Sequence, residues 1–419
     1  MASALNGIRV LDVTHVWAGP LAGRMLADLG AEVIHIQSRA LVDGSPVDKE
    51  EAAFFGTFPD NDPGERPWER QALTNDLNRN KRGLTLELNT PSGLALFKRL
   101  VSVSDVVLEN FSPRVMENFG ITYSVLQRLN PRIIMCSLSG FGLTGPFRDH
   151  VAFGTTIEPA CGLAGITGYP GGGPRLSGNP YPDAVAAMHG TVAVLTALLH
   201  RSKSGVGQQI DLSQCESATC LIGEYVLDLA INHRLPERMG NHDCCCAPYG
   251  CYPCRGEDKW ITIEITGEPQ WQALVESMGN PPWAGEERFS HMNARLENRE
   301  ELDRRVADWT SGYPSHELML LLQEHGIPAG DVLNAEELMN DPHLLARGFF
   351  QPVFHPETGR RLYAGSAIHF EHDSSQKGSP APTLGRDNEW VLKEILGLSD
   401  AEIGRLYREG VIGCEPIQA

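Results

Sequence analysis

Short apolar runs alternate with segments of helical spacing near the start of the chain. Residues 8–13 and 33–36 are apolar runs of strand length, and residues 21–29 between them carry apolar side chains at helical spacing. Pro20 stands at the first turn of this segment and Gly30 follows it, as is usual at helix ends. The pattern predicts a strand, a helix and a second strand.

The alternation continues to about residue 140. Further strands are expected at 84–88, 105–108 and 133–138, and Thr90 is placed to cap a helix that runs to Leu100. Strands that alternate with helices usually pair in parallel under a cover of helices. The sequence therefore predicts an α/β fold with a parallel sheet.

A long apolar helix is predicted at 183–203, with Gly205 as its stop. Small residues along this helix would let another element pack closely against it. They are Ala184, Ala187, Gly190 and Ala193.

The composition of the sequence and the pattern of predicted elements change along the chain. Residues 40–75 are rich in Pro, Asp and Glu and are expected to form a surface excursion. From about residue 225, strands near 250–254 and 260–265 flank a turn, and helical segments follow at 268–278 and 299–325. We expect a first domain at 1–224, a smaller α+β domain at 225–330, and a return to helices and short strands at 331–419.

Composition narrows the function classes. The chain has 419 residues, 42% of them hydrophobic, and a formal net charge of −18. Such acidity disfavours nucleic acid as a partner, although a small anionic ligand can still bind in a locally basic pocket. The first residues lack the features of a secretory signal, and no run of eighteen apolar residues occurs. We therefore expect a cytoplasmic protein with no membrane partner, whose ten cysteines are reduced thiols.

Two features of the N-terminal half bear on ligand binding. After the first strand only Gly19 and Gly23 are present, so the three-glycine dinucleotide fingerprint is absent, and no Walker A sequence occurs. Farther along, the cluster Arg79, Lys81 and Arg82 precedes a predicted strand. It is either a solvated basic turn or a patch that steers a phosphate.

Asp183 begins the long predicted helix. One interpretation is structural: its side chain caps the helix N-terminus. A catalytic interpretation is compatible with the first, because the helix dipole favours the ionised carboxylate, which suits a nucleophile better than a general acid.

Several segments together resemble class III CoA-transferases. They are G-I-R-V-L-D-V-T-H-V-W-A-G-P at 7–20, L-A-D-L-G-A-E-V-I at 26–34, N-R-N-K-R-G-L-T-L-E-L at 78–88, E-N-F-S-P at 109–113, S-G-F-G-L-T-G-P at 139–146 and R-S-K-S-G-V-G-Q-Q-I-D at 201–211. The resemblance runs in register from residue 7 to about residue 412. It implies an interlocked homodimer of ring-shaped subunits, each with a large Rossmann-like domain built from both chain ends and a smaller domain between. A heteromer with a paralogous subunit is the other arrangement considered.

The resemblance places the family's nucleophile on Asp183. In the implied reaction this carboxylate attacks a donor acyl-CoA to give a mixed anhydride, and the CoA thiolate then forms an aspartyl-CoA thioester as the donor acid leaves. An acceptor acid reverses the sequence. Neither ATP nor a permanently bound cofactor is expected, because the coenzyme A thioester is itself the substrate. Covalent intermediates ease the exchange, and water must be excluded because both intermediates hydrolyse.

The resemblance also implies contacts to CoA. The positions concerned are His15, Trp17, Ala18, Arg39, Lys81, Leu86, Asn89, Asn110, Phe111 and Arg114. Three basic residues of formyl-CoA transferases are replaced here, by Asn89, Asn118 and Val151. The cations that could compensate are Arg39, Lys81, Arg82 and Arg114.

The substrate acids are inferred only by class. Gly154 replaces a glutamate of the formyl-CoA branch, which argues against formyl-CoA. The expected donor is succinyl-CoA or a related dicarboxyl-CoA, and the expected acceptor is a free carboxylic acid such as malate, citramalate, or a substituted or aromatic succinate.

Two alternatives remain at this point. An α-methylacyl-CoA racemase would need a histidine where Phe153 stands, and His150 comes three residues too early. A non-catalytic partner subunit would have no need of a nucleophile at Asp183.

Five cysteines gather at residues 240–256 together with His242. Three adjacent cysteines are not expected to converge on one ion, and Cys251 and Cys254 should point to opposite faces of a strand, so no metal site is predicted. In formyl-CoA transferases the matching segment is a glycine-rich flap over the active site. The resemblance therefore implies an active-site flap, made of Asp243, Cys244, Cys245 and Cys246.

Overall fold

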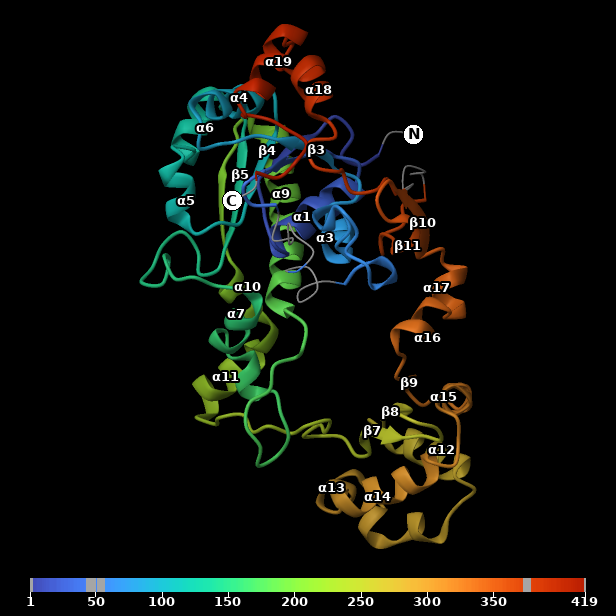
Figure 1. Cartoon of the computed structure of the whole chain (residues 1–419). Helices are drawn as coiled ribbons and strands as arrows, with labels where there is room; N and C mark the ends of the chain where they lie inside the picture. The colour runs from blue at the N-terminus through green and yellow to red at the C-terminus, as the bar shows by residue number, and fades with distance from the viewer. Residues whose placement is uncertain (1–2, 43–49, 51–56, 372–377, 418–419) are drawn as a thin grey trace. The chain divides into compact units, whose positions relative to one another are not determined.

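The computed structural model describes residues 3–42, 50, 57–371 and 378–417. The chain forms two units, which we describe one at a time (Figure 1). Unit 1 comprises Met1–Leu163, Leu176–Leu227 and Leu345–Ala419, and unit 2 comprises Ala164–Arg175 and Asp228–Leu344. Unit 2 thus differs from the smaller domain expected at 225–330. It continues to Leu344, and it also includes the separate segment Ala164–Arg175.

The centre of unit 1 is a six-stranded sheet. Its strands are β1 (Arg9–Asp12), β2 (Glu32–Gln37), β3 (Arg82–Thr85), β4 (Val106–Glu109), β5 (Ile134–Ser139) and β6 (Gln209–Ser213). All neighbours pair in parallel in the order β3-β2-β1-β4-β5-β6, which is the strand order of a Rossmann fold. The predicted parallel sheet is confirmed. Strand β6 is not among the predicted strands, because this edge strand reads Q-I-D-L-S and lacks an apolar run.

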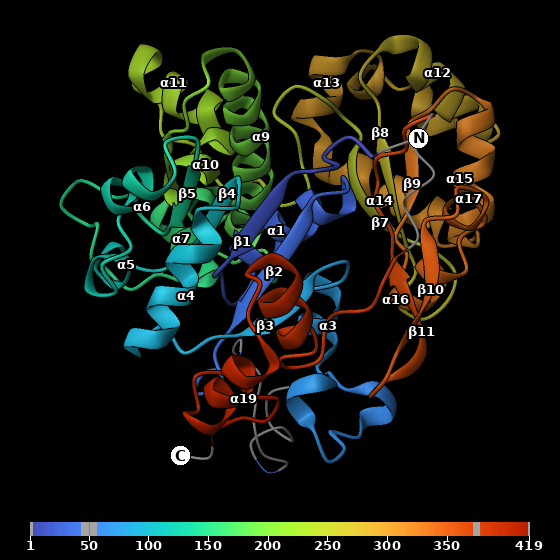
Figure 2. The ribbon, with the colours of Figure 1, turned by 90° about the horizontal axis from the view of Figure 1, so that it is seen from above.

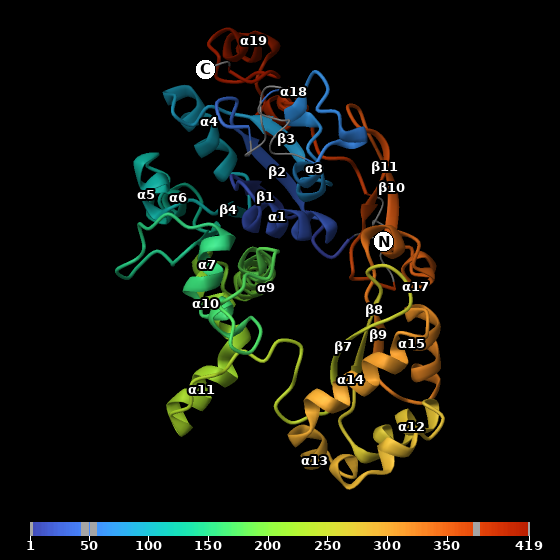
Figure 3. The same ribbon diagram turned by 60° about the horizontal axis from the view of Figure 1, so that its bottom comes forward.

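Helices cover both faces of this sheet. On one face α1 (Ala18–Asp28) and α9 (Tyr181–Ser204) pack side by side (Figure 3). On the other, α4 (Pro91–Val101) and α19 (Asp400–Arg408) pack against the strands (Figure 2). Successive strand residues alternate between the two cores, as pleating requires: Val10 packs on the α1 side and Leu11 on the α4 side.

Helix α9 lies close to β5. A Cβ built on Gly190 would come within 2.7 Å of Leu138 Cδ2, so the close packing predicted from the small residues is confirmed. Gly205 ends the helix in a left-handed conformation, with φ of 75°. By length and composition alone α9 could also span a membrane, but its packing against α1 and the sheet is that of a core helix.

The remaining elements of unit 1 are short. They are η1 (Pro59–Asn61), η2 (Pro67–Glu69), α3 (Ala72–Leu77), α5 (Pro113–Asn118), α6 (Tyr123–Leu129), α7 (Gly154–Ala160), α10 (Gln214–Thr219), η3 (Cys220–Ile222), the hairpin β10 (Phe350–His355) and β11 (Gly359–Ala364), α18 (Asn388–Trp390) and the π-helix η6 (Val391–Ile395). Part of the predicted excursion at 40–75 lies outside the described residues, and its described part holds η1, η2 and α3.

Unit 2 is built on a small antiparallel sheet. Its strands are β7 (Tyr249–Pro253), β8 (Trp260–Glu264) and β9 (Ala329–Asp331), and the first two confirm the predicted hairpin. Its helical elements are α12 (Glu268–Ser277), η4 (Pro282–Gly285), η5 (Glu287–Phe289), α13 (Met292–Glu297), α14 (Arg299–Thr310), α15 (Ser315–Glu324) and α16 (Ala335–Met339). The single helix predicted at 299–325 is wrong, because Gly312 and Pro314 interrupt it. Three helices cross the unit boundaries: α8 (Leu163–Ile166), α11 (Gly223–Asn232) and α17 (Pro342–Ala346).

Candidate active site

Asp183 is the third residue of α9, and its side chain is only 7% exposed. The N-cap position belongs to Pro180, so the predicted capping role of Asp183 is wrong. The carboxylate nevertheless lies in the first turn of the helix, where the helix dipole favours negative charge.

The Asp183 carboxylate also meets the N-terminus of α1. The backbone N–H of Ala18, the first residue of α1, donates a hydrogen bond to it. Burial raises the pKa of Asp183 to about 6, while the N–H groups of Ala18 and of Asp183 itself act to lower it. Burial thus outweighs the predicted stabilisation of the charge. At pH 7 a pKa of about 6 still leaves roughly a tenfold excess of carboxylate over acid.

Gly154 lies directly against the Asp183 carboxylate. A Cβ built on Gly154, the first residue of α7, would lie 1.8 Å from Asp183 Oδ2 and 2.5 Å from Pro180 Cβ. Only glycine fits while Asp183 keeps its place. The glutamate of the formyl-CoA branch therefore does not fit at this position, in line with the expected change of substrate.

The loops that follow β1 and β4 are joined beside Asp183's partner Ala18. The His15 N–H donates to Asn110 Oδ1 at 2.9 Å, and Asn110 Nδ2 donates to the His15 carbonyl at 2.8 Å. The rings of His15 and Phe111 lie 5.2 Å apart. Trp17 is the N-cap residue of α1. The structure thus brings predicted residues from two adjacent strand ends together at the carboxyl edge of the sheet, where open parallel sheets bind ligands.

The sequence analysis missed two residues of this region. Val16 has a φ of 69°, a strained conformation for a β-branched residue, and such strain is concentrated at functional loops. The sequence carries no pattern from which this positive φ could be predicted. Glu109 is buried at the end of β4 and accepts a hydrogen bond from the Phe111 N–H at 2.9 Å. Its place in the E-N-F-S-P motif could have singled it out. Burial raises its pKa to about 7, while the nearby Ser137 side chain and the Phe111 N–H act to lower it.

Lys81 is not available to a phosphate in this structure. Its side chain is fully buried, and Nζ donates to Asp12 Oδ2 at 2.8 Å, Pro20 O at 2.9 Å and Asn78 Oδ1 at 2.8 Å. Three acceptors satisfy all three donors of the ammonium group. Gly23 of α1 leaves room for this pair, since a Cβ there would come 2.5 Å from Asp12 Oδ2. All three Nζ donors are thus engaged within unit 1, and a contact between Lys81 and CoA stays a prediction.

The two arginines of the same cluster are also engaged. Arg79 is 3% exposed and pairs with Asp28 at 2.7 Å, while the guanidinium of Arg82 lies 3.6 Å from the ring centroid of Trp390. The cluster is neither a solvated turn nor a free phosphate patch. Instead, Arg79 and Arg82 link the β3 region to α1 and to the C-terminal segment.

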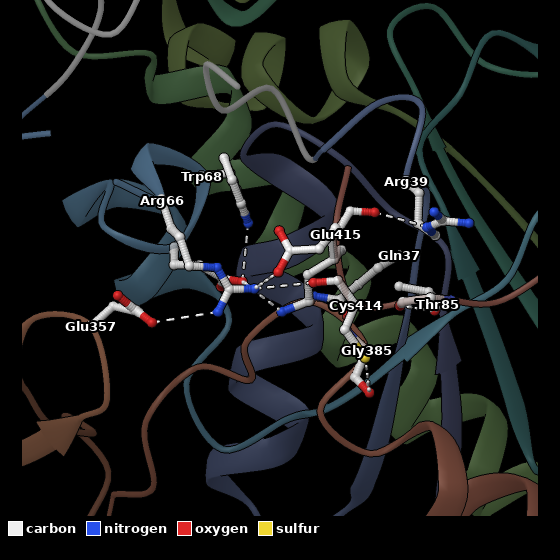
Figure 4. Close-up of polar contacts among 12 residues, drawn as sticks. Gln37, Arg39, Arg66, Trp68, Thr85, Glu357, Gly385, Cys414 and Glu415 are labelled. Atoms are coloured by element: carbon white, nitrogen blue, oxygen red, sulfur yellow. Dashed lines mark hydrogen bonds and ion pairs between the residues drawn. The ribbon is translucent and has the colours of Figure 1, made fainter. Parts of the chain in front are cut away.

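Arg39 also serves the C-terminal segment. Its Nε donates to Glu415 O at 2.8 Å (Figure 4), and its Nη1 donates to Gly410 O at 3.3 Å. Arg66 reaches the same segment through Cys414 O at 3.0 Å (Figure 4). Two of the Arg39 guanidinium nitrogens therefore donate to backbone carbonyls, and the contact of Arg39 with a CoA phosphate stays a prediction.

The other predicted CoA contacts lie in different environments. The Leu86 side chain is 2% exposed within the core on the α4 face, so a contact with CoA would have to come from its backbone, and that contact stays a prediction. Asn89 is exposed before α4. Arg114 is exposed on α5 and has no ion pair or hydrogen bond with any other described side chain. Phe153, at the racemase histidine position, is the N-cap residue of α7 and carries no titratable group.

The cysteine-rich segment lies in unit 2. Cys244 Sγ and Cys245 Sγ are 3.3 Å apart, and both lie within 4.8 Å of an Asp243 carboxylate oxygen. Two of the three adjacent thiols therefore lie together, whereas Cys246 is not part of the group, and the expectation that all three do not converge on one ion stays a prediction. Cys251 lies on β7 and Cys254 directly after it, outside the cluster. The flap role of residues 243–246 stays a prediction, because Asp183 belongs to unit 1.

Comparisons with known proteins identify the family of the chain. Residues 5–388 match the model of CoA-transferase family III. The chain is 34% identical over 414 residues to succinyl-CoA–D-citramalate CoA-transferase of Chloroflexus aurantiacus, covering 97% of this chain and 98% of that protein. It is 31% identical over 409 residues to the alpha subunit of succinyl-CoA–L-malate CoA-transferase of the same organism, covering 97% and 92%. A CAIB/BAIF family protein from Brucella suis superimposes with a TM-score of 0.82 at 28% identity, covering 94% of this chain and 100% of that one. The chain therefore belongs to CoA-transferase family III and is a CoA-transferase.

Proposed function

We propose that the enzyme transfers CoA from succinyl-CoA to a substituted succinate or a hydroxy dicarboxylic acid, through covalent intermediates on Asp183. The observation that carries the proposal is the buried Asp183 carboxylate at the N-termini of α1 and α9. Support for the acid class comes from the relatives, whose names give succinyl-CoA as donor and D-citramalate or L-malate as acceptor.

The first step uses the carboxylate as nucleophile. One Asp183 oxygen attacks the thioester carbonyl of the donor, the C–S bond breaks, and CoA leaves as a thiolate with an acyl-aspartyl anhydride behind it. The thiolate then attacks the Asp183 carbonyl carbon and displaces the donor carboxylate. An acceptor carboxylate attacks the resulting aspartyl thioester, and CoA returns to the new acyl group by the same two steps. Each bond that forms replaces a bond of similar kind, so no external energy source is needed.

The surroundings of Asp183 suit this chemistry. Each attack places negative charge on an oxygen beside the helix N-termini, where the Ala18 N–H is already directed at the carboxylate. Preorganised N–H donors of this kind stabilise oxyanions in acyl transfer. Burial also makes the carboxylate less solvated than a surface aspartate. A less solvated carboxylate is a stronger nucleophile toward a carbonyl, and exclusion of water protects the anhydride.

We propose that CoA is held by the loops after β1 and β4. Trp17 and Phe111 offer apolar contact to the pantetheine arm, while the His15–Asn110 hydrogen bonds keep the two loops together. Among the predicted cations, Arg114 is the one whose guanidinium has no partner within the described part of the chain. It is our candidate for a phosphate contact.

The exposed apolar surface favours an oligomer. No residue of α11 is buried, and its large apolar side chains are exposed. Those on α11 and on the outer side of α9 are Tyr225, Val226, Leu227, Leu229, Ile231, Met188, Val192 and Leu199. We propose that a second subunit covers them, either an identical chain in the interlocked ring or a paralogue. The alpha subunit among the relatives makes the second arrangement a real alternative.

A substrate panel tests this function. The purified enzyme is given succinyl-CoA with one free acid at a time, and the acyl-CoA products are read by mass spectrometry. We expect new thioesters from citramalate, malate or a substituted succinate in the wild-type enzyme, and none in Asp183→Ala or Asp183→Asn of the same oligomeric state. Exchange at a near-normal rate in both variants would exclude the proposed mechanism.

A further inference from the structure

The cysteine-rich segment of unit 2 presents a compact set of soft ligands. Cys244 Sγ and Cys245 Sγ lie 3.3 Å apart, and one carboxylate oxygen of Asp243 completes a group whose members are within 4.8 Å of one another. Both thiols are exposed to solvent. Cys246 is next to the group, with its thiol in hydrogen-bonding contact with the Asp243 side chain.

The backbone that carries these ligands is fixed from outside. Arg299 of α14 donates from Nη2 to the carbonyl of Asp243 and, at 3.3 Å, to that of Cys246, so it ties together the two ends of the segment. Within the segment, the Cys245 N–H donates to Asp243 Oδ1 at 2.7 Å. The thiols are therefore held side by side by contacts that do not involve the sulfur atoms.

A second anchor lies just before the segment. His242 Nε2 is 2.9 Å from Asp303 Oδ2, and the Tyr252 hydroxyl donates to Asp303 Oδ1 at 2.7 Å. Asp303 belongs to α14, the helix that also carries Arg299. One helix thus positions the segment on both sides, which is the kind of outer support that ligand groups need to hold a fixed geometry.

We propose that Asp243, Cys244 and Cys245 bind one thiophilic divalent cation of the zinc and cadmium class, through two thiolates and one carboxylate. Two thiolates at about 2.3 Å from a tetrahedral zinc lie about 3.8 Å apart. The observed separation of 3.3 Å needs only a small opening of the pair. Sulfur ligands select zinc, cadmium and other soft ions over magnesium or calcium. A fourth position is left for water or the Cys246 thiol, and the bound ion would lock residues 243–246 into one conformation.

Metal titration of the reduced, desalted full-length protein tests the proposal. Cadmium alone and zinc alone are added, cadmium binding being read from the ultraviolet charge-transfer band of cadmium thiolates and zinc binding from competition. We expect one equivalent per chain in the wild type and in Cys220→Ser, which removes an exposed single thiol. The double variant Cys244→Ser, Cys245→Ser should lose the equivalent, and Arg299→Gln should weaken binding about 10- to 100-fold by releasing the segment. Thermal unfolding without metal shows that each variant is folded.

Three results would overturn the site. One is stoichiometric binding that survives the double variant. Another is equal loss of binding in Cys220→Ser, which would mean that any exposed thiol captures the metal. The third is a peptide map of reduced wild-type protein in which Cys244 and Cys245 remain joined to each other. Should the double variant fail to fold, Asp243→Asn takes its place, and unchanged affinity in it would likewise refute the site.

Discussion

Gly154 and Asp183 touch so closely that a Cβ on Gly154 would lie 1.8 Å from Asp183 Oδ2. The contact joins the first residue of α7 to the first turn of α9. The Ala18 N–H donates a hydrogen bond to the same carboxylate. The geometry of the proposed nucleophile thus depends on a residue that has no side chain.

Gly154→Ala is expected to lower kcat about 100-fold, because the added methyl group displaces the carboxylate from its attacking position. Gly165→Ala is the matched control, since a Cβ on this helical glycine meets nothing within 4 Å. Steady-state kinetics compares kcat of the two variants after their oligomeric state has been checked. Equal activity in the two variants would show that Asp183 does not need its observed position.

The pKa of Asp183, raised to about 6 by burial, predicts a pH profile. Below pH 6 the carboxylate becomes protonated and loses its nucleophilicity, so the rate of the first half-reaction should fall about tenfold per pH unit. Measuring loss of donor acyl-CoA without acceptor avoids titration of the acceptor acid. A profile that stays flat down to pH 4.5 would contradict the buried environment of this carboxylate.

Lys81→Met is expected to destabilise the fold by about 3–5 kcal/mol, because it leaves the Asp12 carboxylate buried without its cation. The pKa of Asp12 follows from the same contacts: burial raises it, but Lys81, His35 and Thr14 together bring it below its usual value. Denaturant unfolding measures the loss. Arg114→Met is the contrasting variant, expected to keep wild-type stability and to raise KM for acyl-CoA. If Lys81→Met instead has wild-type stability and only a raised KM for acyl-CoA, Lys81 contacts CoA rather than stabilising the fold.

Glu109→Gln is expected to flatten the pH dependence of stability. The pKa of Glu109 is raised by burial from 4.5 to about 7, so between these values the folded state holds a proton that the unfolded state releases. Stability conferred by the neutral acid is present below pH 4.5 and is lost as pH rises to 7, by up to about 3 kcal/mol. Denaturant unfolding at pH 5 and pH 8 compares wild type and variant. Parallel changes in both proteins would show that another group titrates.

The elements that the sequence predicted are those with local signals. The first strand, α1 and β2 follow from apolar runs and helical spacing, and the Thr90 cap is confirmed by a bond from the Gly93 N–H at 3.0 Å. Asp183 stood out by its place at a helix start. In each case neighbouring residues carry enough information, because the structure concerned is held together by contacts within a few positions.

The failures share a different cause. Lys81 reads as a surface cation because its partner Asp12 lies 69 positions away, and only the parallel sheet brings them together. The side-by-side placement of Cys244 and Cys245 likewise depends on Arg299 of α14, which donates to the carbonyls at the two ends of their loop. Long-range contacts of this kind leave no local pattern, so neither outcome was accessible from the sequence.

Trapping the covalent intermediate shows directly whether Asp183 is the nucleophile. The enzyme is incubated with donor acyl-CoA without acceptor, quenched with hydroxylamine, digested and mapped by mass spectrometry. The account predicts a hydroxamate on Asp183, formed in proportion to donor consumed and absent from Asp183→Asn. An unmodified Asp183 peptide in enzyme that has consumed donor, with the label on another residue or on none, would contradict it.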